Sequence, residues 1–161
     1  MVSDSLIETL EVISNKLRGQ NVKWVVVGSA SLALQGVKVT PNDLDILTNK
    51  KGAHAMNKLL KEYEVKPVSF GRSTLFESHF GKFKVGEMRV EVMGNLKLKL
   101  GGTWRSYTHR LRSPAIIAVD GMKIPVSSLR SQFRSTKLLH RRGASLRALR
   151  IEKRLREVAR G

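Results

Sequence analysis

Three acidic side chains in two short apolar segments are the residues of this sequence best suited to chemistry. Asp43 and Asp45 lie in the run DLDIL, and Glu91 lies between two valines in MRVEVMG. Side chains two residues apart on a strand point to the same face, so Asp43 and Asp45 point together while Leu44 and Ile46 face the core. If the strand of Glu91 lies beside theirs, the three carboxylates converge.

Carboxylate oxygens at this spacing suit Mg²⁺ or Mn²⁺. Magnesium usually takes only one or two protein carboxylates and completes its octahedron with water and phosphate oxygens, which a nucleoside triphosphate supplies. Asp43 and Asp45 would bridge two ions about 3.5 to 4 Å apart, and Glu91 would complete a site that activates an attacking hydroxyl. The structural alternative is that the aspartates form a solvated strand face and that Glu91 pairs with Arg89 or Arg72.

A glycine-serine pair lies before the acids, where an apolar run turns into a helical segment. Backbone N–H groups at such a turn lack helical partners and, together with the helix dipole, attract phosphate. Gly28 lets a phosphate group approach closely. The Ser29 hydroxyl can donate to a phosphate oxygen, although it can equally cap the following helix. The pair is therefore a candidate triphosphate site.

The elements that must position these residues follow from the spacing of apolar side chains. A capping box of Ser5 and Glu8 opens a helix that ends at Gly19. A second, short helix is expected at 30–35, and a third at 52–63. Strands are expected at 22–27, 43–47, 65–70, 74–83 and 87–93.

The second half of the chain is harder to divide. Residues 94–113 are interpreted as a basic loop around Trp104, because Gly101 and Gly102 interrupt a stretch rich in Lys and Arg. Asp120-Gly121 predicts a hairpin between strands at 116–119 and 122–126. Helices at 128–140 and 144–160, separated at Gly143, complete the chain.

The segments V-V-V-G-S-A-S-L-A-L-Q-G, D-L-D-I-L and R-V-E-V-M-G together resemble the nucleotidyltransferase superfamily, which includes DNA polymerase β and the CCA-adding enzymes. More narrowly, the chain resembles small, functionally uncharacterised nucleotidyltransferase-like proteins of thermophiles. The resemblance implies an α/β (α+β) fold like the polymerase β palm, with a mixed β-sheet flanked by helices and further C-terminal helices. It also implies transfer of a nucleoside monophosphate from an NTP, with release of pyrophosphate.

The same resemblance assigns residues. It implies Gly28 and Ser29 on the triphosphate, Asp43 and Asp45 as metal ligands, and Glu91 as the third acid. Many relatives have an arginine or serine just before the acids. At that place this chain offers the Lys38 and Thr40 side chains, which we expect to contribute to nucleotide binding.

Charge points to a polyanionic partner. Lysine and arginine outnumber aspartate and glutamate 30 to 13, for a formal net charge of +17, and residues 129–161 carry a net +9 of it. Leucines 138, 139, 146, 149 and 155 form an expected buried stripe of this tail. The Lys and Arg side chains outside this stripe could contact nucleic acid, or they could simply form a solvated helical face. They are Arg134, Lys137, Arg141, Arg142, Arg147, Arg150 and Arg154.

Composition also bounds the class of protein. The length suits one globular domain, here a nucleotidyltransferase-like catalytic region at 1–127 with a basic helical extension at 128–161 packed on it. The absence of cysteine excludes disulfides, thiolate catalysis and zinc-cysteine sites, and fits a reducing cytosol or adaptation to heat. The acidic N-terminus and the lack of a long apolar run favour a cytoplasmic protein with no membrane partner.

Three functions remain open from the sequence. The first is a Mg²⁺-dependent nucleotidyltransferase acting on a hydroxyl or phosphate acceptor, plausibly on RNA rather than DNA. The second is a non-catalytic RNA-binding or ribosome-associated module on the same fold. The third is an antitoxin-like or subunit-like partner of another protein. The sequence specifies neither the acceptor, nor the preferred base, nor the oligomeric state.

Overall fold

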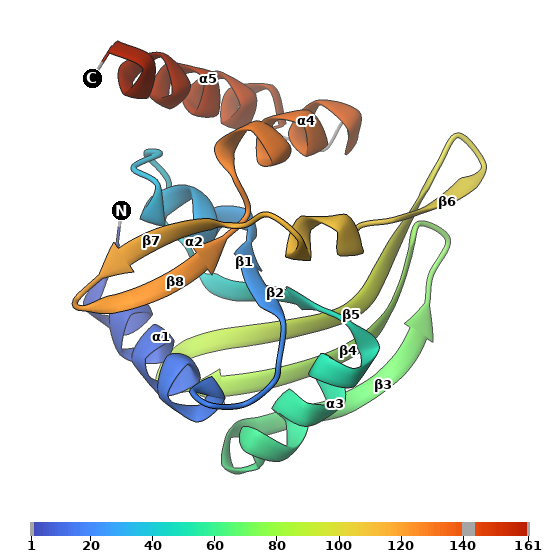
Figure 1. Cartoon of the computed structure of the whole chain (residues 1–161). Coiled ribbons are helices and arrows are strands. Elements are labelled where there is room, and N and C mark those ends of the chain that lie inside the picture. Colours follow the sequence, from blue (N-terminus) through green and yellow to red (C-terminus); the bar gives the residue numbers. More distant parts are fainter. Residues whose placement is uncertain (1, 140–143, 161) are drawn as a thin grey trace.

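The computed structural model describes residues 2–139 and 144–160, which form a mixed β-sheet flanked by helices (Figure 1). The sheet order is β3-β4-β5-β2-β1-β8-β7, and β6 pairs with the end of β5. This confirms the expected fold class. The strands are β1 (Trp24–Val27), β2 (Asp43–Thr48), β3 (Glu64–Arg72), β4 (Phe76–Val85), β5 (Met88–Leu100), β6 (Thr103–Ser106), β7 (Ala115–Val119) and β8 (Met122–Val126).

Figure 1 shows α4 and α5 at one end of the molecule, away from α1 and α3. Short 3₁₀ turns, η1 and η2, complete the described elements. The helical segments are α1 (Asp4–Leu17), α2 (Gly28–Leu34), α3 (Lys50–Leu59), η1 (Lys61–Tyr63), η2 (Thr108–Leu111), α4 (Leu129–Leu139) and α5 (Ala144–Arg160).

One face of the sheet packs on α1 and α3. Leu44 and Ile46 of β2 and Val90 and Val92 of β5 are fully buried there, in a cluster that includes Leu10 of α1. Because strand side chains alternate, the residues between them point to the opposite face. The acids of β2 and β5 therefore lie on the face away from α1 and α3.

The N-terminal helix begins earlier than its capping box predicts. Ser3 is the N-cap, and the Leu6 N–H donates to the Ser3 hydroxyl at 3.2 Å. Ser5 lies inside the helix, where its carbonyl accepts from the Thr9 hydroxyl at 2.8 Å. The prediction of a Ser5 cap was wrong because Ser3 also meets the requirement for a hydroxyl two or three residues before a free N–H.

The predicted basic loop at 94–113 is largely ordered secondary structure. β5 continues to Leu100, and β6 returns alongside it. Gly101 and Gly102 have φ values of +57° and +79°. Two successive residues with positive φ make the tight turn that suits a two-residue hairpin, so the glycines join two strands rather than interrupting a loop.

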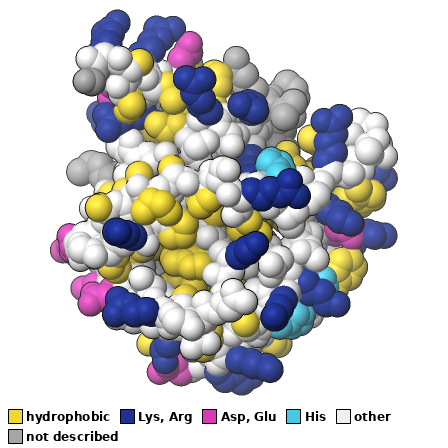
Figure 2. Space-filling view, viewed as in Figure 1, with side chains coloured by type: hydrophobic (Ala, Val, Ile, Leu, Met, Phe, Trp, Pro, Cys, Tyr) yellow, Lys and Arg dark blue, Asp and Glu magenta, His cyan; other side chains and the backbone are white. Residues whose placement is uncertain are grey.

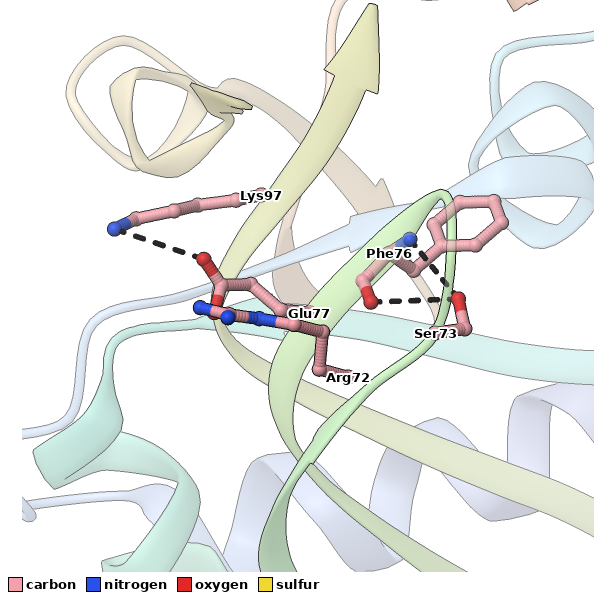
Figure 3. Close-up of polar contacts among 5 residues, drawn as sticks. All are labelled: Arg72, Ser73, Phe76, Glu77 and Lys97. Atoms are coloured by element: carbon pink, nitrogen blue, oxygen red, sulfur yellow. Dashed lines mark hydrogen bonds and ion pairs between the residues drawn. The ribbon is translucent and has the colours of Figure 1, made fainter. Parts of the chain in front are cut away.

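A buried acid holds the base of this hairpin. Glu77 of β4 is 7% exposed and lies between Arg72 and Lys97, with Arg72 Nη2 2.8 Å and Lys97 Nζ 3.9 Å from its carboxylate oxygens (Figure 3). Trp104 of β6 lies against Arg72 and Lys99, 5.4 and 5.8 Å from its ring centroid. Arg72 of β3, through Trp104, and Lys97 of β5, through Glu77, therefore hold the hairpin to the sheet.

The buried face of α5 differs from the predicted leucine stripe. Ile151 is fully buried with Leu32 and Leu129, whereas Leu146 and Leu149 are 55% and 62% exposed. Leu155 packs against this cluster as predicted, but the prediction was wrong for Leu146 and Leu149, because α5 docks through its middle, around Ile151, on the segment that follows α2. The side chains of Leu138 and Leu139 lie outside the described residues. The predicted break at Gly143 lies outside the described residues. No helix in the described part of the chain has the length and apolarity needed to cross a membrane.

Candidate active site

The strand of Glu91 lies directly beside the strand of the two aspartates. β2 and β5 are parallel neighbours, with Asp45 opposite Glu91 and Asp43 opposite Arg89. Opposite residues on adjacent strands are about 4.8 Å apart and point to the same face. Asp43, Asp45 and Glu91 are all partly buried. The sheet thus brings the three acids to one face, as the sequence predicts.

Arg89 forms an ion pair with one of these carboxylates. Its Nε lies 2.8 Å from Asp43 Oδ1, and the two side chains are 69% and 33% exposed. Glu91 therefore does not pair with Arg89, and Arg72 pairs with Glu77 instead. Within residues 2–139 and 144–160, no three acidic or histidine side chains converge closely enough to hold a metal ion. The sheet therefore places the three acids on one face, but the predicted convergence of their carboxylates is not found among the described residues.

Gly28 lies against the carboxylate of Asp45. Val27 of β1 pairs with Asp45 of β2, and the chain turns at Gly28 with a φ of +69°. A β-carbon on Gly28 would lie 2.9 Å from Asp45 Oδ2. Only glycine combines this left-handed backbone with so close an approach. The predicted glycine-serine turn therefore adjoins the acids.

A glutamine of α4 holds this turn, which sequence reasoning missed. Gln132 is 6% exposed, and its Oε1 accepts from the Gly28 N–H at 3.0 Å. Its Nε2 donates to the Ser31 hydroxyl at 2.7 Å. The Gly28 N–H expected for phosphate is thus already bonded. No local sequence signal connects positions 28 and 132, which are 104 residues apart.

The segment between α2 and β2 carries the other predicted nucleotide ligands. Lys38 and Thr40 are exposed, and their roles stay predictions. Arginines of α5 hold this segment by its backbone: Arg150 Nη1 donates to the Lys38 carbonyl at 3.1 Å, and Arg154 Nε donates to the Gln35 carbonyl at 2.8 Å. These two arginines, predicted to contact nucleic acid, therefore have structural partners.

The remaining predicted nucleic-acid contacts are less constrained. Arg134 and Arg147 are exposed. Arg141 and Arg142 lie outside the described residues, and so does the side chain of Lys137. Figure 2 shows Lys and Arg side chains spread over the visible face of the molecule rather than gathered on the C-terminal helices alone.

Comparisons with known proteins agree with this fold. A family model described as aminoglycoside-2''-adenylyltransferase matches residues 9–154. A crystal structure of a "putative nucleotidyltransferase" from Thermotoga maritima is 34% identical, with a TM-score of 0.82 over 98% of this chain and 96% of that chain. None of the curated proteins matches this chain.

Two solved antibiotic adenylyltransferases share the fold. The lincosamide adenylyltransferase LnuA, solved with lincomycin, is 12% identical, with a TM-score of 0.55 over 94% of this chain and 97% of that chain. ANT(2'')-Ia, solved with adenylyl-2''-tobramycin, is 8% identical, with a TM-score of 0.52 over 89% of this chain and 84% of that chain. At these identities the likeness extends to the fold alone.

Proposed function

Because the chain belongs to the aminoglycoside-2''-adenylyltransferase family of nucleotidyltransferases, we propose that it transfers a nucleoside monophosphate from an NTP to an acceptor hydroxyl. One observation carries the proposal: Glu91 lies opposite Asp45 on the neighbouring strand, with Gly28 against the Asp45 carboxylate. In the reaction the acceptor oxygen bonds to the α-phosphorus, the bond from that phosphorus to the bridging oxygen breaks, and pyrophosphate leaves.

The acids fit Mg²⁺ or Mn²⁺ by the chemistry of their donor atoms. Hard carboxylate oxygens are the ligands these ions prefer, and one or two per ion suffice. Asp43 and Asp45 would hold the metal, and Glu91 would complete the site. Gly28 has no side chain to displace the Asp45 carboxylate, since a β-carbon there would lie 2.9 Å from Asp45 Oδ2. When bound, the metal would stabilise negative charge on the reacting phosphate.

The side chains around the acids have distinct roles in this proposal. Glu91 accepts the proton of the attacking hydroxyl, because its carboxylate shares the face with Asp45. Ser29, Lys38 and Thr40 contact the phosphates, with Gly28 allowing close approach. Arg89 is 69% exposed and can turn into solvent to release Asp43.

The charge of the chain favours an anionic acceptor. The acceptor of ANT(2'')-Ia, tobramycin, is an aminoglycoside and hence a polycation, which a protein of net charge +17 repels. A hydroxyl on RNA is therefore the first acceptor to test. The same charge supports the alternative that the protein binds RNA without catalysis.

The experiment measures transfer of label from each α-labelled NTP, with Mg²⁺, to a short RNA, tobramycin or lincomycin. Asp45→Asn should abolish transfer. Asp120→Asn is the matched control, because Asp120 is exposed at the β7–β8 turn and asparagine tolerates its positive φ of 45°. Failure of all acceptors, with RNA binding unchanged in Asp43→Asn/Asp45→Asn, would instead support the non-catalytic alternative.

A further inference from the structure

A second site candidate lies between the end of the β5–β6 hairpin, η2 and α4. It is a hollow of about 180 Å³, here called the η2–α4 cavity. Its lining carries three arginines, three serines and no acid. The lining residues are Leu100, Arg105, Ser106, Tyr107, His109, Arg110, Ser131, Arg134 and Ser135.

Arg110 is the unusual member of this lining. Its Nε is buried and has no hydrogen-bond partner in the described part of the chain. Its Nη2 donates to the Ser131 carbonyl at a long 3.4 Å, and its guanidinium carbon lies 4.8 Å from the centre of the Tyr107 ring. None of the ion pairs among the described residues includes Arg110.

The guanidinium of Arg110, which is partly buried, needs partners for its charge. Burial lowers the pKa of Arg110, but arginine stays protonated in proteins, so the group keeps its charge. A partly desolvated cation without a paired anion is less favourable than one that has such a partner. The other cavity arginines, Arg105 and Arg134, add positive charge rather than cancel it. An anion entering the cavity would therefore meet three guanidinium groups and no carboxylate.

Phosphate is the anion that this set of donors suits. Guanidinium groups bind phosphate oxygens through two parallel hydrogen bonds, which a compact ammonium group does not reproduce. Ser106 and Ser131 add hydroxyl groups to the lining. Arginines and hydroxyls without acids are the combination that protein sites use for phosphate.

The cavity belongs to the same face of the sheet as the acids. Tyr107 packs in a cluster with Val27 and Leu47, whose side chains share the alternating face of Asp45. α4, which contributes Ser131 and Arg134, also holds Gly28 through Gln132. A molecule in the cavity is thus on the side of the sheet where transfer would occur.

We propose that the η2–α4 cavity binds a phosphate group of a substrate, held by Arg110 with Arg105 and Arg134. Its assignment to a substrate depends on the proposed transferase function, whereas the binding itself does not. The phosphate belongs either to the NTP and its pyrophosphate product or to a phosphate-bearing acceptor. Both sources present the same oxyanion to the arginines.

The test is calorimetric titration of the full chain with pyrophosphate, and separately with a 5′-phosphorylated tetraribonucleotide, in low salt without metal. Arg110→Gln should weaken binding roughly tenfold or more, because a charge-assisted contact is lost. Arg112→Gln is the matched control, since Arg112 is exposed nearby but does not line the cavity. It should bind as the unmodified chain does.

A second variant guards against a folding defect. If Arg110→Gln melts early, Arg105→Gln/Arg134→Gln changes only exposed side chains and should show the same loss. Tighter binding of pyrophosphate assigns the site to the nucleotide, and tighter binding of the oligonucleotide assigns it to the acceptor. Equal binding by the unmodified chain and the double variant, or no binding by either, overturns the proposal.

The outcome is separable from that of the transferase proposal. Asp45→Asn leaves the cavity lining intact, so it should keep phosphate binding while losing label transfer. Phosphate binding without transfer in the unmodified chain would refute the transferase function alone. Transfer that survives in Arg105→Gln/Arg134→Gln, with unchanged KM for both substrates, would refute the cavity alone.

Discussion

At the scale of residues, the contact between Gly28 and Asp45 joins the two parts of the candidate site. The backbone of Gly28 has a positive φ of 69°, and a β-carbon there would press on the Asp45 carboxylate at 2.9 Å. Gly86 has a similar φ of 57° but has open space around it. Substituting alanine at Gly86 should therefore show the effect of backbone strain alone, whereas alanine at Gly28 should also displace the Asp45 carboxylate.

We expect Gly28→Ala to reduce nucleotidyl transfer at least tenfold, because the methyl group would displace the Asp45 carboxylate. Both Gly28→Ala and Gly86→Ala should lower the free energy of unfolding by about 1 to 2 kcal/mol, since each forces a left-handed residue. Denaturant unfolding and transfer rates measure the two effects. Equal transfer by both variants would contradict the close approach.

Arg89 should compete with divalent metal for Asp43. Removing it with Arg89→Ala is expected to lower the Mg²⁺ concentration needed for half-maximal transfer, because Asp43 no longer has a resident cation. Arg89 is 69% exposed, so the free energy of unfolding should change by less than about 1 kcal/mol. Lys123→Ala, at an exposed residue of β8, is the control for net charge. An unchanged Mg²⁺ requirement in Arg89→Ala would argue against metal at Asp43.

At the scale of elements, α4 and α5 hold the turns beside the acids rather than standing apart as a basic tail. α4 reaches Gly28 through Gln132, and α5 holds the α2–β2 segment through Arg150 and Arg154. Ile151 of α5 is buried in a cluster with Leu32 of α2 and Leu129 of α4. The C-terminal helices thus support the positions of the candidate nucleotide ligands.

Ile151→Ala should lower the free energy of unfolding by about 2 to 5 kcal/mol, because it leaves a cavity under α5. Leu149→Ala should change it by less than about 0.5 kcal/mol, since Leu149 is 62% exposed. Thermal and denaturant unfolding of the two variants provide the comparison. The reverse order of effects would restore the leucine stripe as the buried face.

The sequence predicts the strands of the three acids and the face they share, because alternation along β2 and β5 is a local signal. It does not predict which side of α5 is buried, because its apolar residues occur on more than one face and only the docking surface chooses. In the sequence, Gly101-Gly102 looks like an interruption of regular structure. The positive φ values of both residues show that it is a tight turn between two strands. The contact of Gln132 with Gly28 joins segments that are distant in the sequence, so no local pattern of residues predicts it.

At the scale of the whole molecule, Lys and Arg side chains lie over much of the surface and not only near the three acids. The net charge of +17 is distributed over the sheet as well as the helices (Figure 2). Such a field attracts polyanions before any specific contact forms. RNA binding and catalysis are therefore expected to respond to different substitutions.

Binding of single-stranded RNA should weaken steeply with salt, with a slope in log K against log salt of about 0.7 per neutralised phosphate. Arg134→Gln/Arg147→Gln should make this slope shallower by about 1.4, because it removes two exposed cations. Asp43→Asn/Asp45→Asn should leave the slope unchanged. Filter binding over a salt series measures both, and identical slopes for all three proteins would count against contacts by the C-terminal helices.

The position of β1 in the sheet has a consequence for synthesis of the protein. β1 lies between β2 and β8, so one of its edges pairs with a strand that begins at Met122. On the ribosome, that Val-Val-Val edge stays open until residues 122–126 emerge, and open apolar edges invite pairing with other chains. Nascent chains that stall before β8 should therefore aggregate or recruit chaperones, although all three acids are already made.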